Sequence, residues 1–288
     1  MQLFVNDLTV IDFSYLCTQR GMVGESWIVD LTLHGELDEQ NMVLDFSKVK
    51  KQVKRIIDDT VDHKLAIPTE YSGVNVQHIE GQDYIKVEFE SVGGEKIAIS
   101  SPSDAYCFVD ADRIEMSHVI KHLASVIKPQ LPANVKKVEL SLRAEDISGF
   151  YYHYTHGLKK HDGNCQRIAH GHRSKIQIFE NDMKSPRLEK EASKLWEDIY
   201  VATDEDEVAE SELEFISKTQ SQVAYKYESS QGKFELAMEK ASVYSMPVDT
   251  TVELIAQYLA DKLKAQYPHN SYKVVAYEGV AKGAIAFA

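Results

Sequence analysis

Residues 170–200, HGHRSKIQIFENDMKSPRLEKEASKLWEDIY, combine a strand pattern with a helix pattern. Residues 170–180 carry the alternation of a half-buried β-strand. Residues 185–200 follow as a helix, with Ser185 as a candidate N-cap and Pro186 in the first turn, where proline is tolerated. The segment therefore predicts a strand that leads directly into a helix.

The first half of the chain repeats this order of elements. Residues 26–37 alternate like a strand, and residues 42–58 follow as a helix with the apolar stripe Phe46, Val49, Val53, Ile56 and Ile57. Each half then continues with a hairpin, a second helix and a final strand. These segments are 83–100, 113–129 and 134–142 in the first half, and 221–239, 248–266 and 271–279 in the second. A repeat of about 140 residues indicates a tandem duplication, with its boundary near residues 143–148.

Composition restricts the class of protein. The chain has 288 residues, 43% of them hydrophobic and 27% charged, as in a globular protein. A net charge of −13 argues against a general nucleic-acid or membrane-surface binder, because phosphate groups are bound by basic surfaces. No apolar run approaches the roughly 20 residues of a membrane-spanning helix. We therefore expect neither a nucleic-acid nor a membrane partner.

The termini and cysteines indicate a cytoplasmic protein. The first residues, MQLFVNDLTVIDF, lack the basic start of a signal peptide. Cys17, Cys107 and Cys165 are odd in number and far apart, so they do not form a disulfide framework.

Residues 153–172 contain five of the eleven histidines. His170 and His172 are two positions apart on a predicted strand, so their imidazoles project from the same face. Gly171 leaves the opposite face bare, which favours close packing of another strand. With His156 upstream, three nitrogen ligands and one open position would resemble a catalytic zinc site. The alternative is a solvated surface pair of histidines.

These residues resemble the 6-pyruvoyltetrahydropterin synthase and 6-carboxytetrahydropterin synthase family of the tunnelling fold. Residues 156–158 are similar to its HRL turn, residues 170–172 match its HGH strand, and Cys165 stands where its catalytic cysteine precedes HGH. Glu278 resembles the pterin-binding glutamate in an E-x4-G-x-I pattern. Residues 251–253 resemble a Ser/Thr-x-Glu pattern, which adds Thr251 and Glu253 as candidate substrate-binding residues.

The first half resembles the family at the complementary positions. Residues 34–51 are similar to its strand–turn–helix segment, and residues 62–64, Asp-His-Lys, resemble the motif that supplies its Asp-His proton relay. However, residues 23–25, Val-Gly-Glu, replace HGH, and Leu16 or Cys17 lies near the missing upstream histidine. Residues 199–207 of the second half contain no Asp-His pair. Because the family builds its site at subunit junctions, this complementary loss predicts one composite site made from both halves.

Further departures indicate that the substrate could be altered. Ser117 replaces the helix glutamate in the first half, and Arg173-Ser174 replaces the usual Asn-aromatic pair after HGH.

The resemblance implies an α+β fold of two tunnelling-fold modules, residues 1–143 and 144–288. Each module would be an antiparallel sheet with two helices on one face, and the chains would assemble as a homo-oligomer into a β-barrel. The implied substrate is 7,8-dihydroneopterin triphosphate. The expected products are 6-carboxytetrahydropterin, acetaldehyde and triphosphate, on the route to queuosine.

The resemblance also implies the role of each site residue. Zn²⁺ on His156, His170 and His172 would act as a Lewis acid. Cys165 would be the general base, and Asp62 would orient His63, which would shuttle a proton. Glu278 would accept paired hydrogen bonds from the pterin. The alternatives are triphosphate elimination to 6-pyruvoyltetrahydropterin, an aldolase-like cleavage, or a non-catalytic zinc- or pterin-binding protein.

Overall fold

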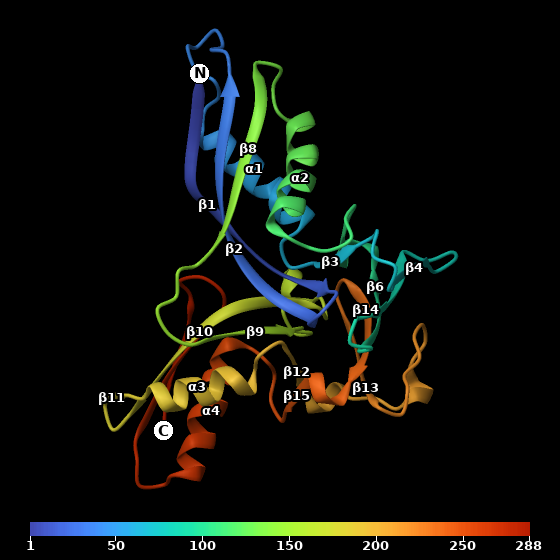
Figure 1. Cartoon of the computed structure of the whole chain (residues 1–288), viewed down its shortest axis with the longest axis vertical. Helices are drawn as coiled ribbons and strands as arrows, with labels where there is room; N and C mark the ends of the chain where they lie inside the picture. Colours follow the sequence, from blue (N-terminus) through green and yellow to red (C-terminus); the bar gives the residue numbers. More distant parts are fainter.

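The computed structural model describes residues 1–288, and each half of the chain begins with an antiparallel strand pair. In the first half, β1 (Gln2–Cys17) pairs with β2 (Gly21–Gly35). In the second half, β9 (Tyr151–His156) pairs with β10 (His170–Glu180). Figure 1 shows the two pairs crossing near the middle of the molecule. The strand predicted from residues 170–180 is confirmed.

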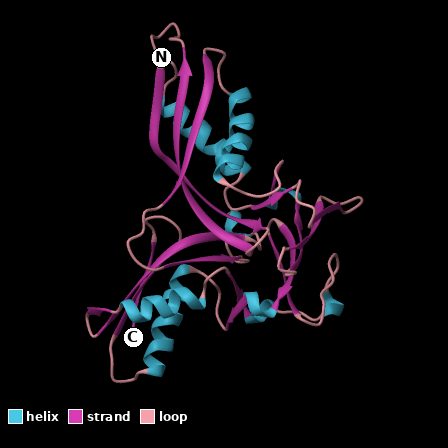
Figure 2. Cartoon of the chain, viewed as in Figure 1, coloured by secondary structure: helices cyan, strands magenta, loops and turns pink.

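Two helices pack on one face of each main sheet (Figure 2). They are α1 (Phe46–Thr60) and α2 (Met116–Ile127) in the first half, and α3 (Pro186–Leu195) and α4 (Val252–Gln266) in the second. The Asp45 carboxylate caps α1 by accepting hydrogen bonds from the backbone N–H groups of Ser47 and Lys48. The predicted stripe of α1 is buried except for Phe46, which is 52% exposed because it occupies the first position of the helix.

The main sheets are mixed, which corrects the expectation of purely antiparallel sheets. In the first half the strand order is β7–β3–β1–β2–β8, where β3 (Leu65–Pro68) and β7 (Tyr106–Val109) pair in parallel. In the second half the order is β15–β12–β9–β10–β16–β17, where β12 (Ile199–Thr203) and β15 (Val243–Met246) are the parallel additions. These short strands return to the sheet through helix or hairpin connections, which permit parallel pairing where a tight turn does not.

The remaining strands complete the two main sheets, with β8 and β17 as edge strands. They are β8 (Val135–Ala144), β11 (Met183–Lys184), β16 (Tyr272–Tyr277) and β17 (Gly283–Phe287). The last of these pairs antiparallel with β16 and continues the final strand predicted from the sequence.

A third sheet joins the two halves of the chain. It has the order β13–β14–β6–β5–β4. Its strands are β4 (Val74–His78), β5 (Tyr84–Glu90), β6 (Lys96–Pro102), β13 (Gln222–Ser229) and β14 (Gly232–Glu239). Both predicted hairpins are therefore confirmed, and they pair with each other through β6 and β14. A shared apolar core of 21 buried residues lies under this sheet, so the halves are packed together rather than loosely tethered.

The two strand pairs cross at a pair of glycines. A Cβ on Gly171 would lie 2.6 Å from the Cα of Gly24, and a Cβ on Gly24 would lie 1.9 Å from the carbonyl oxygen of Tyr154. Beside them, the hydroxyls of Ser14 and Thr155 are hydrogen bonded at 2.7 Å. The close strand packing predicted for the bare face of Gly171 is confirmed, and β2 is the strand that packs there. No helix of the chain is long and apolar enough to span a bilayer.

Candidate metal centre

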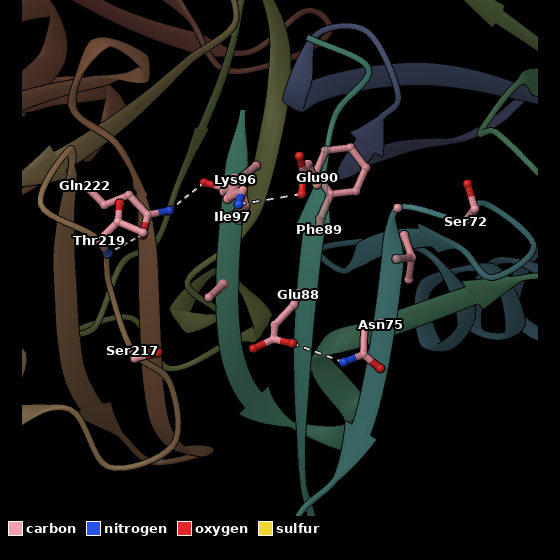
Figure 3. A pocket seen from close by; sticks show the side chains of 13 residues that line it. Ser72, Asn75, Glu88, Phe89, Glu90, Lys96, Ile97, Ser217, Thr219 and Gln222 are labelled. Carbon is pink, nitrogen blue, oxygen red and sulfur yellow. Dashed lines mark hydrogen bonds and ion pairs between the residues drawn. The ribbon is translucent and has the colours of Figure 1, made fainter. Parts of the chain in front are cut away.

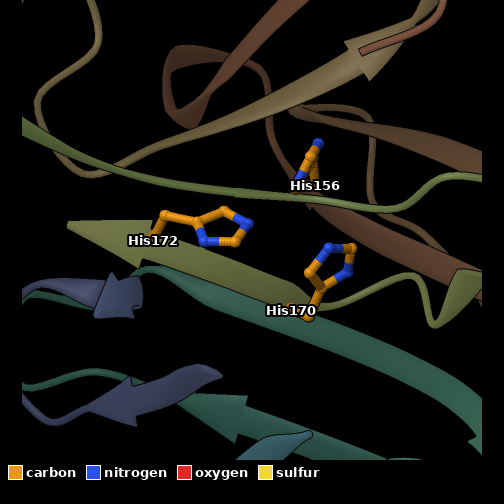
Figure 4. A group of neighbouring side chains, drawn as sticks. All are labelled: His156, His170 and His172. Carbon is orange, nitrogen blue, oxygen red and sulfur yellow. The ribbon is translucent and has the colours of Figure 1, made fainter. Parts of the chain in front are cut away.

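Three buried histidines form a cluster at the paired ends of β9 and β10. His156 and His170 lie opposite each other in the strand register, and His172 lies two positions further along β10. Their exposed fractions are 0%, 0% and 1%. One ring nitrogen from each lies within 4.8 Å of the others, and Figure 4 shows the three rings gathered between the strands. The alternative, a solvated surface pair of histidines, is therefore ruled out.

The unpaired nitrogens of the cluster suit a metal ion. The Nδ1 of His156 lies 2.9 Å from the carbonyl oxygen of Thr250, and the Nδ1 of His170 lies 3.0 Å from that of Arg167. Because a carbonyl oxygen can only accept, the Nδ1 atom of each ring carries the proton and donates it in a hydrogen bond. The Nε2 atoms of His156, His170 and His172 are all buried without a hydrogen-bond partner. Buried polar atoms are normally satisfied, so three such atoms together fit a metal site.

Burial also favours the protonation state that metal binding requires. It lowers the pKa of His156 and of His170 well below the ordinary value for histidine, and the neighbouring imidazoles lower both values further. Both rings are therefore neutral at physiological pH, and neutral imidazole is the form that binds metal.

A carboxylate from the first half faces the third histidine. The Oδ1 of Asp12 lies 3.3 Å from the Nδ1 of His172, and Asp12 is 3% exposed. The hydroxyl of Ser26 donates to Asp12 at 2.5 Å, and the Nζ of Lys282 lies 3.2 Å from its other oxygen. Burial alone would raise the pKa of Asp12, but His172, Lys282 and Ser26 lower it below its ordinary range. Asp12 is therefore ionised.

Asp62 and His63 lie beside the histidine cluster. The ring of His63 is 5.3 Å from that of His170, centroid to centroid, and its Nδ1 is 2.6 Å from the Oδ2 of Asp62. His63 has a left-handed backbone (φ 54°), and its N–H donates to the Asp12 carbonyl at 2.7 Å. The Asp12 N–H in turn donates to Asp62 at 2.8 Å. These backbone contacts fix the Asp-His pair to β1.

Cys165 also interacts with His63. It occupies a short turn between β9 and β10, and its carbonyl accepts a hydrogen bond from the N–H of Leu158 at 2.9 Å. Burial would lower the pKa of His63, but hydrogen bonds with Asp62 and Cys165 raise it to about 10. The structure thus brings Cys165, His63 and Asp62 together with the histidine cluster, within one chain.

Glu278 connects to the same region through Lys282. It follows β16, and its carboxylate lies 3.7 Å from the Nζ of Lys282, the same ammonium that contacts Asp12. The backbone N–H of Gly279 donates to Ser174 on β10, which keeps this turn against the strand of His172.

Thr251 and Glu253 are further from the histidines. The Thr251 hydroxyl caps α4, and this residue also lines a cavity of about 130 Å³ beside the loop that follows His156. Glu253 is exposed on the first turn of α4. Thr250, one residue earlier, contacts His156. Sequence reasoning missed Thr250, Asp12 and Lys282, because no motif marks them.

The equivalent position in the first half has lost the metal ligands. Gly24 pairs with Ser14 as Gly171 pairs with Thr155, so the register aligns Val23 and Glu25 with His170 and His172. The same register aligns Tyr15 with His156. The position of the missing upstream histidine is therefore Tyr15 and not Leu16 or Cys17, because the strand ends are offset by one or two residues.

Ion pairs occupy this second position. Leu65 pairs with Ser14 as Tyr200 pairs with Thr155, which aligns Glu197-Asp198 with Asp62-His63. Asp198 shares the left-handed backbone (φ 56°) and is ion paired with Arg20. A cavity of about 390 Å³ lies beside this ion pair. It is lined by Arg20, Tyr151, Tyr152, His153, Ser193, Lys194, Glu197 and Asp198. No three-ligand cluster forms there, so each chain contains one candidate metal centre.

Another cavity, of about 410 Å³, lies on the sheet that joins the two halves (Figure 3). Polar side chains that line it are paired with one another: the Asn75 amide donates a hydrogen bond to Glu88, and Lys96 forms an ion pair with Glu90. None of the predicted site residues lines it, and we assign no site to it.

Comparisons with known proteins agree with the duplication. The family model described as 6-pyruvoyl tetrahydropterin synthase matches residues 18–141 and again residues 147–287. Similar solved structures include the 6-pyruvoyl tetrahydropterin synthase of Plasmodium vivax (18% identity, 51% of this chain and 93% of that chain covered, TM-score 0.41). The Plasmodium falciparum enzyme is also similar (15% identity, 49% and 90% covered, TM-score 0.39). No curated protein matches the chain.

Proposed function

Since this chain belongs to the 6-pyruvoyl tetrahydropterin synthase family, we propose that it is a zinc-dependent lyase acting on 7,8-dihydroneopterin triphosphate. We propose 6-carboxytetrahydropterin, acetaldehyde and triphosphate as products, for queuosine synthesis in the cytoplasm. Residues 1–143 and 144–288 would form the two modules. The observation that carries the proposal is the position of His63, whose ring lies 5.3 Å from that of His170.

His156, His170 and His172 would hold the zinc ion through their buried Nε2 atoms, which have no other partner. When bound, zinc supplies Lewis acidity to the oxygens of the substrate side chain. The surrounding carbonyls of Thr250 and Arg167 keep two of the imidazoles in the tautomer that presents Nε2.

Cys165 and His63 would move protons on the substrate. We assign Cys165 as the general base that removes a proton from the side chain. The contact with Asp62 raises the pKa of His63, which favours the protonated imidazole that donates a proton. Asp62 holds the imidazole of His63 by its Nδ1 at 2.6 Å, which fixes the orientation of the ring.

Glu278 would bind the pterin ring. Its carboxylate matches the paired N–H donors of an aminopyrimidinone in geometry and charge. In the free protein Lys282 lies 3.7 Å from this carboxylate, and the lysine side chain is 51% exposed. Substrate binding would therefore exchange a solvent-exposed ion pair for directional hydrogen bonds. Thr251 and Glu253 would contribute further substrate contacts at the N-terminus of α4.

The direct test is product analysis. The zinc-loaded protein is incubated with 7,8-dihydroneopterin triphosphate, and pterins and acetaldehyde are measured by mass spectrometry. Acetaldehyde with a carboxypterin supports the proposal. Release of triphosphate with 6-pyruvoyltetrahydropterin would instead support the activity for which the family model is named. If the zinc-loaded protein binds the substrate without turnover, that result would support a non-catalytic binding function and contradict the proposed lyase activity.

The assembly is a separate part of the proposal. Formation of a homo-oligomeric β-barrel from several chains would appear as a mass several times 32.6 kDa in light scattering. A monomeric and active protein would show that the barrel is not required.

A further inference from the structure

The three histidines of the metal centre are oriented in two different ways. His156 and His170 use Nδ1 to contact backbone carbonyls of their own half of the chain. The Nδ1 of His172 has no carbonyl partner and instead lies 3.3 Å from the carboxylate of Asp12, which belongs to the other half. We propose that Asp12 is a positioning residue for His172 and sets the metal affinity of the site from the opposite half of the chain.

The contacts of Asp12 support a fixed rather than an incidental position. Ser26 donates to its Oδ1 at 2.5 Å. Its backbone N–H donates to Asp62, and its carbonyl accepts from the N–H of His63. A Cβ on Gly279 would lie 2.3 Å from its Oδ1, so the turn after Glu278 packs directly against the carboxylate. One residue therefore contacts the metal cluster, the Asp-His pair and the Glu278 turn.

A carboxylate at this place has a chemical effect that a carbonyl does not. It carries a full negative charge, which stabilises the positive charge that develops on an imidazole bound to a cation. Lys282 partly offsets that charge from 3.2 Å away. The metal affinity should therefore decrease when Asp12 loses its charge and increase when Lys282 loses its own.

The chain contains a matched control for this interaction. Glu25 is a buried carboxylate on β2, and the strand register makes its position equivalent to that of His172. Its carboxylate lies 3.9 Å from the Nδ1 of His153. It faces a histidine from the other half, as Asp12 does, but no metal cluster lies beside it. The Glu25–His153 contact thus repeats the Asp12–His172 contact with the carboxylate and the imidazole exchanged between the equivalent positions, and Glu25→Gln removes its carboxylate as Asp12→Asn does in the first contact.

The test measures metal binding and needs no substrate. Zinc affinity is obtained by competition with a chromogenic chelator, and Co²⁺ is used as a spectroscopic probe of the ligand field. Asp12→Asn should weaken zinc binding about 10- to 100-fold and shift the visible Co²⁺ bands. Glu25→Gln should leave both unchanged, and Lys282→Met should strengthen zinc binding several-fold.

The inference rests on the metal centre of the proposed function, and the outcomes separate the two. A wild-type protein that binds neither zinc nor Co²⁺ would contradict the metal centre itself. A wild type that binds zinc, with Asp12→Asn equal to it in affinity and spectrum, would overturn only the role of Asp12. If Asp12→Asn does not fold, Ser26→Ala removes the donor that fixes the carboxylate, and unchanged affinity in both Ser26→Ala and Lys282→Met would overturn the inference.

Discussion

The rings of His63 and His170 lie 5.3 Å apart, centroid to centroid, although one residue belongs to each half of the chain. This distance places the Asp62-His63 pair beside the metal cluster without any second chain. The histidine cluster and the Asp62-His63 pair thus come from different halves of the sequence, and folding of a single chain brings them together.

Removing His63 should stop proton transfer without disturbing the metal. A positioned acid–base group contributes about 10²- to 10⁴-fold to the rate, so His63→Gln should lower kcat by that factor. Zinc content, measured by elemental analysis, should stay at the wild-type value because His63 is not one of the clustered ligands. Asp198→Asn is the control, since Asp198 holds the equivalent position in the other half. Equal activity in the two variants would contradict the composite site.

Cys165 should be needed for turnover but not for metal binding. Its interaction with His63 puts it at the reacting side of the site rather than among the three histidines. Cys165→Ala should therefore retain zinc and lose at least about 10²-fold in kcat. Cys17→Ala changes another free, half-buried cysteine and should be active. Turnover at the wild-type rate by Cys165→Ala would remove this residue from the mechanism.

The glycine crossing should be sensitive to a single methyl group. A Cβ on Gly24 would lie 1.9 Å from the Tyr154 carbonyl oxygen, so the strands must separate in Gly24→Ala. Overpacking of this kind costs about 1–3 kcal/mol and sometimes more. Urea denaturation should show that loss in the free energy of unfolding. In Gly93→Ala the new Cβ meets its nearest neighbour, the Ser91 hydroxyl, at 3.7 Å, and this variant should unfold like the wild type.

Glu25 should make the metal-free protein less stable as the pH rises. Burial raises its pKa from 4.5 to about 7, so the native state holds this proton more tightly than the unfolded chain does. The stabilisation is complete below about pH 4.5 and is lost as the pH rises to about 7 and above. Glu25→Gln removes this dependence, which is on the order of 3 kcal/mol.

The measurement is chemical denaturation of both proteins at pH 5 and pH 8 in the presence of a chelator. The free energy of unfolding of Glu25→Gln minus that of the wild type should be larger at pH 8 than at pH 5. A difference between the two proteins that is the same at both pH values would show that Glu25 does not titrate in this range.

Local patterns predicted the elements well, because alternation and helical spacing are recorded in neighbouring residues. The helix after β2, the hairpins and the face shared by His170 and His172 all follow from such patterns. Even the packing of another strand on Gly171 could be inferred, since a missing side chain leaves room for one.

The missing parts depend on contacts that are remote in sequence. Asp12 reads as one polar residue in an alternating strand, and only the fold brings it to His172. The parallel strands β3 and β12 are short, and their direction is set by the connections that precede them. Tyr15 was missed in favour of Leu16 or Cys17, because a difference of one or two residues in strand register is invisible until the strands are paired.

The ion pair of Arg20 with Asp198 has a consequence for how this protein can evolve. In an assembly of identical subunits, every mutation is copied into every site at once. Here a substitution in one half leaves the other half untouched, so selection acts on each side of the crossing separately. Tyr15, Val23 and Glu25 occupy the positions of the three histidines in the first half, so three substitutions would be needed to place the same ligands there. The candidate metal centre and the Asp62-His63 pair therefore stay together only while both halves are inherited as one chain.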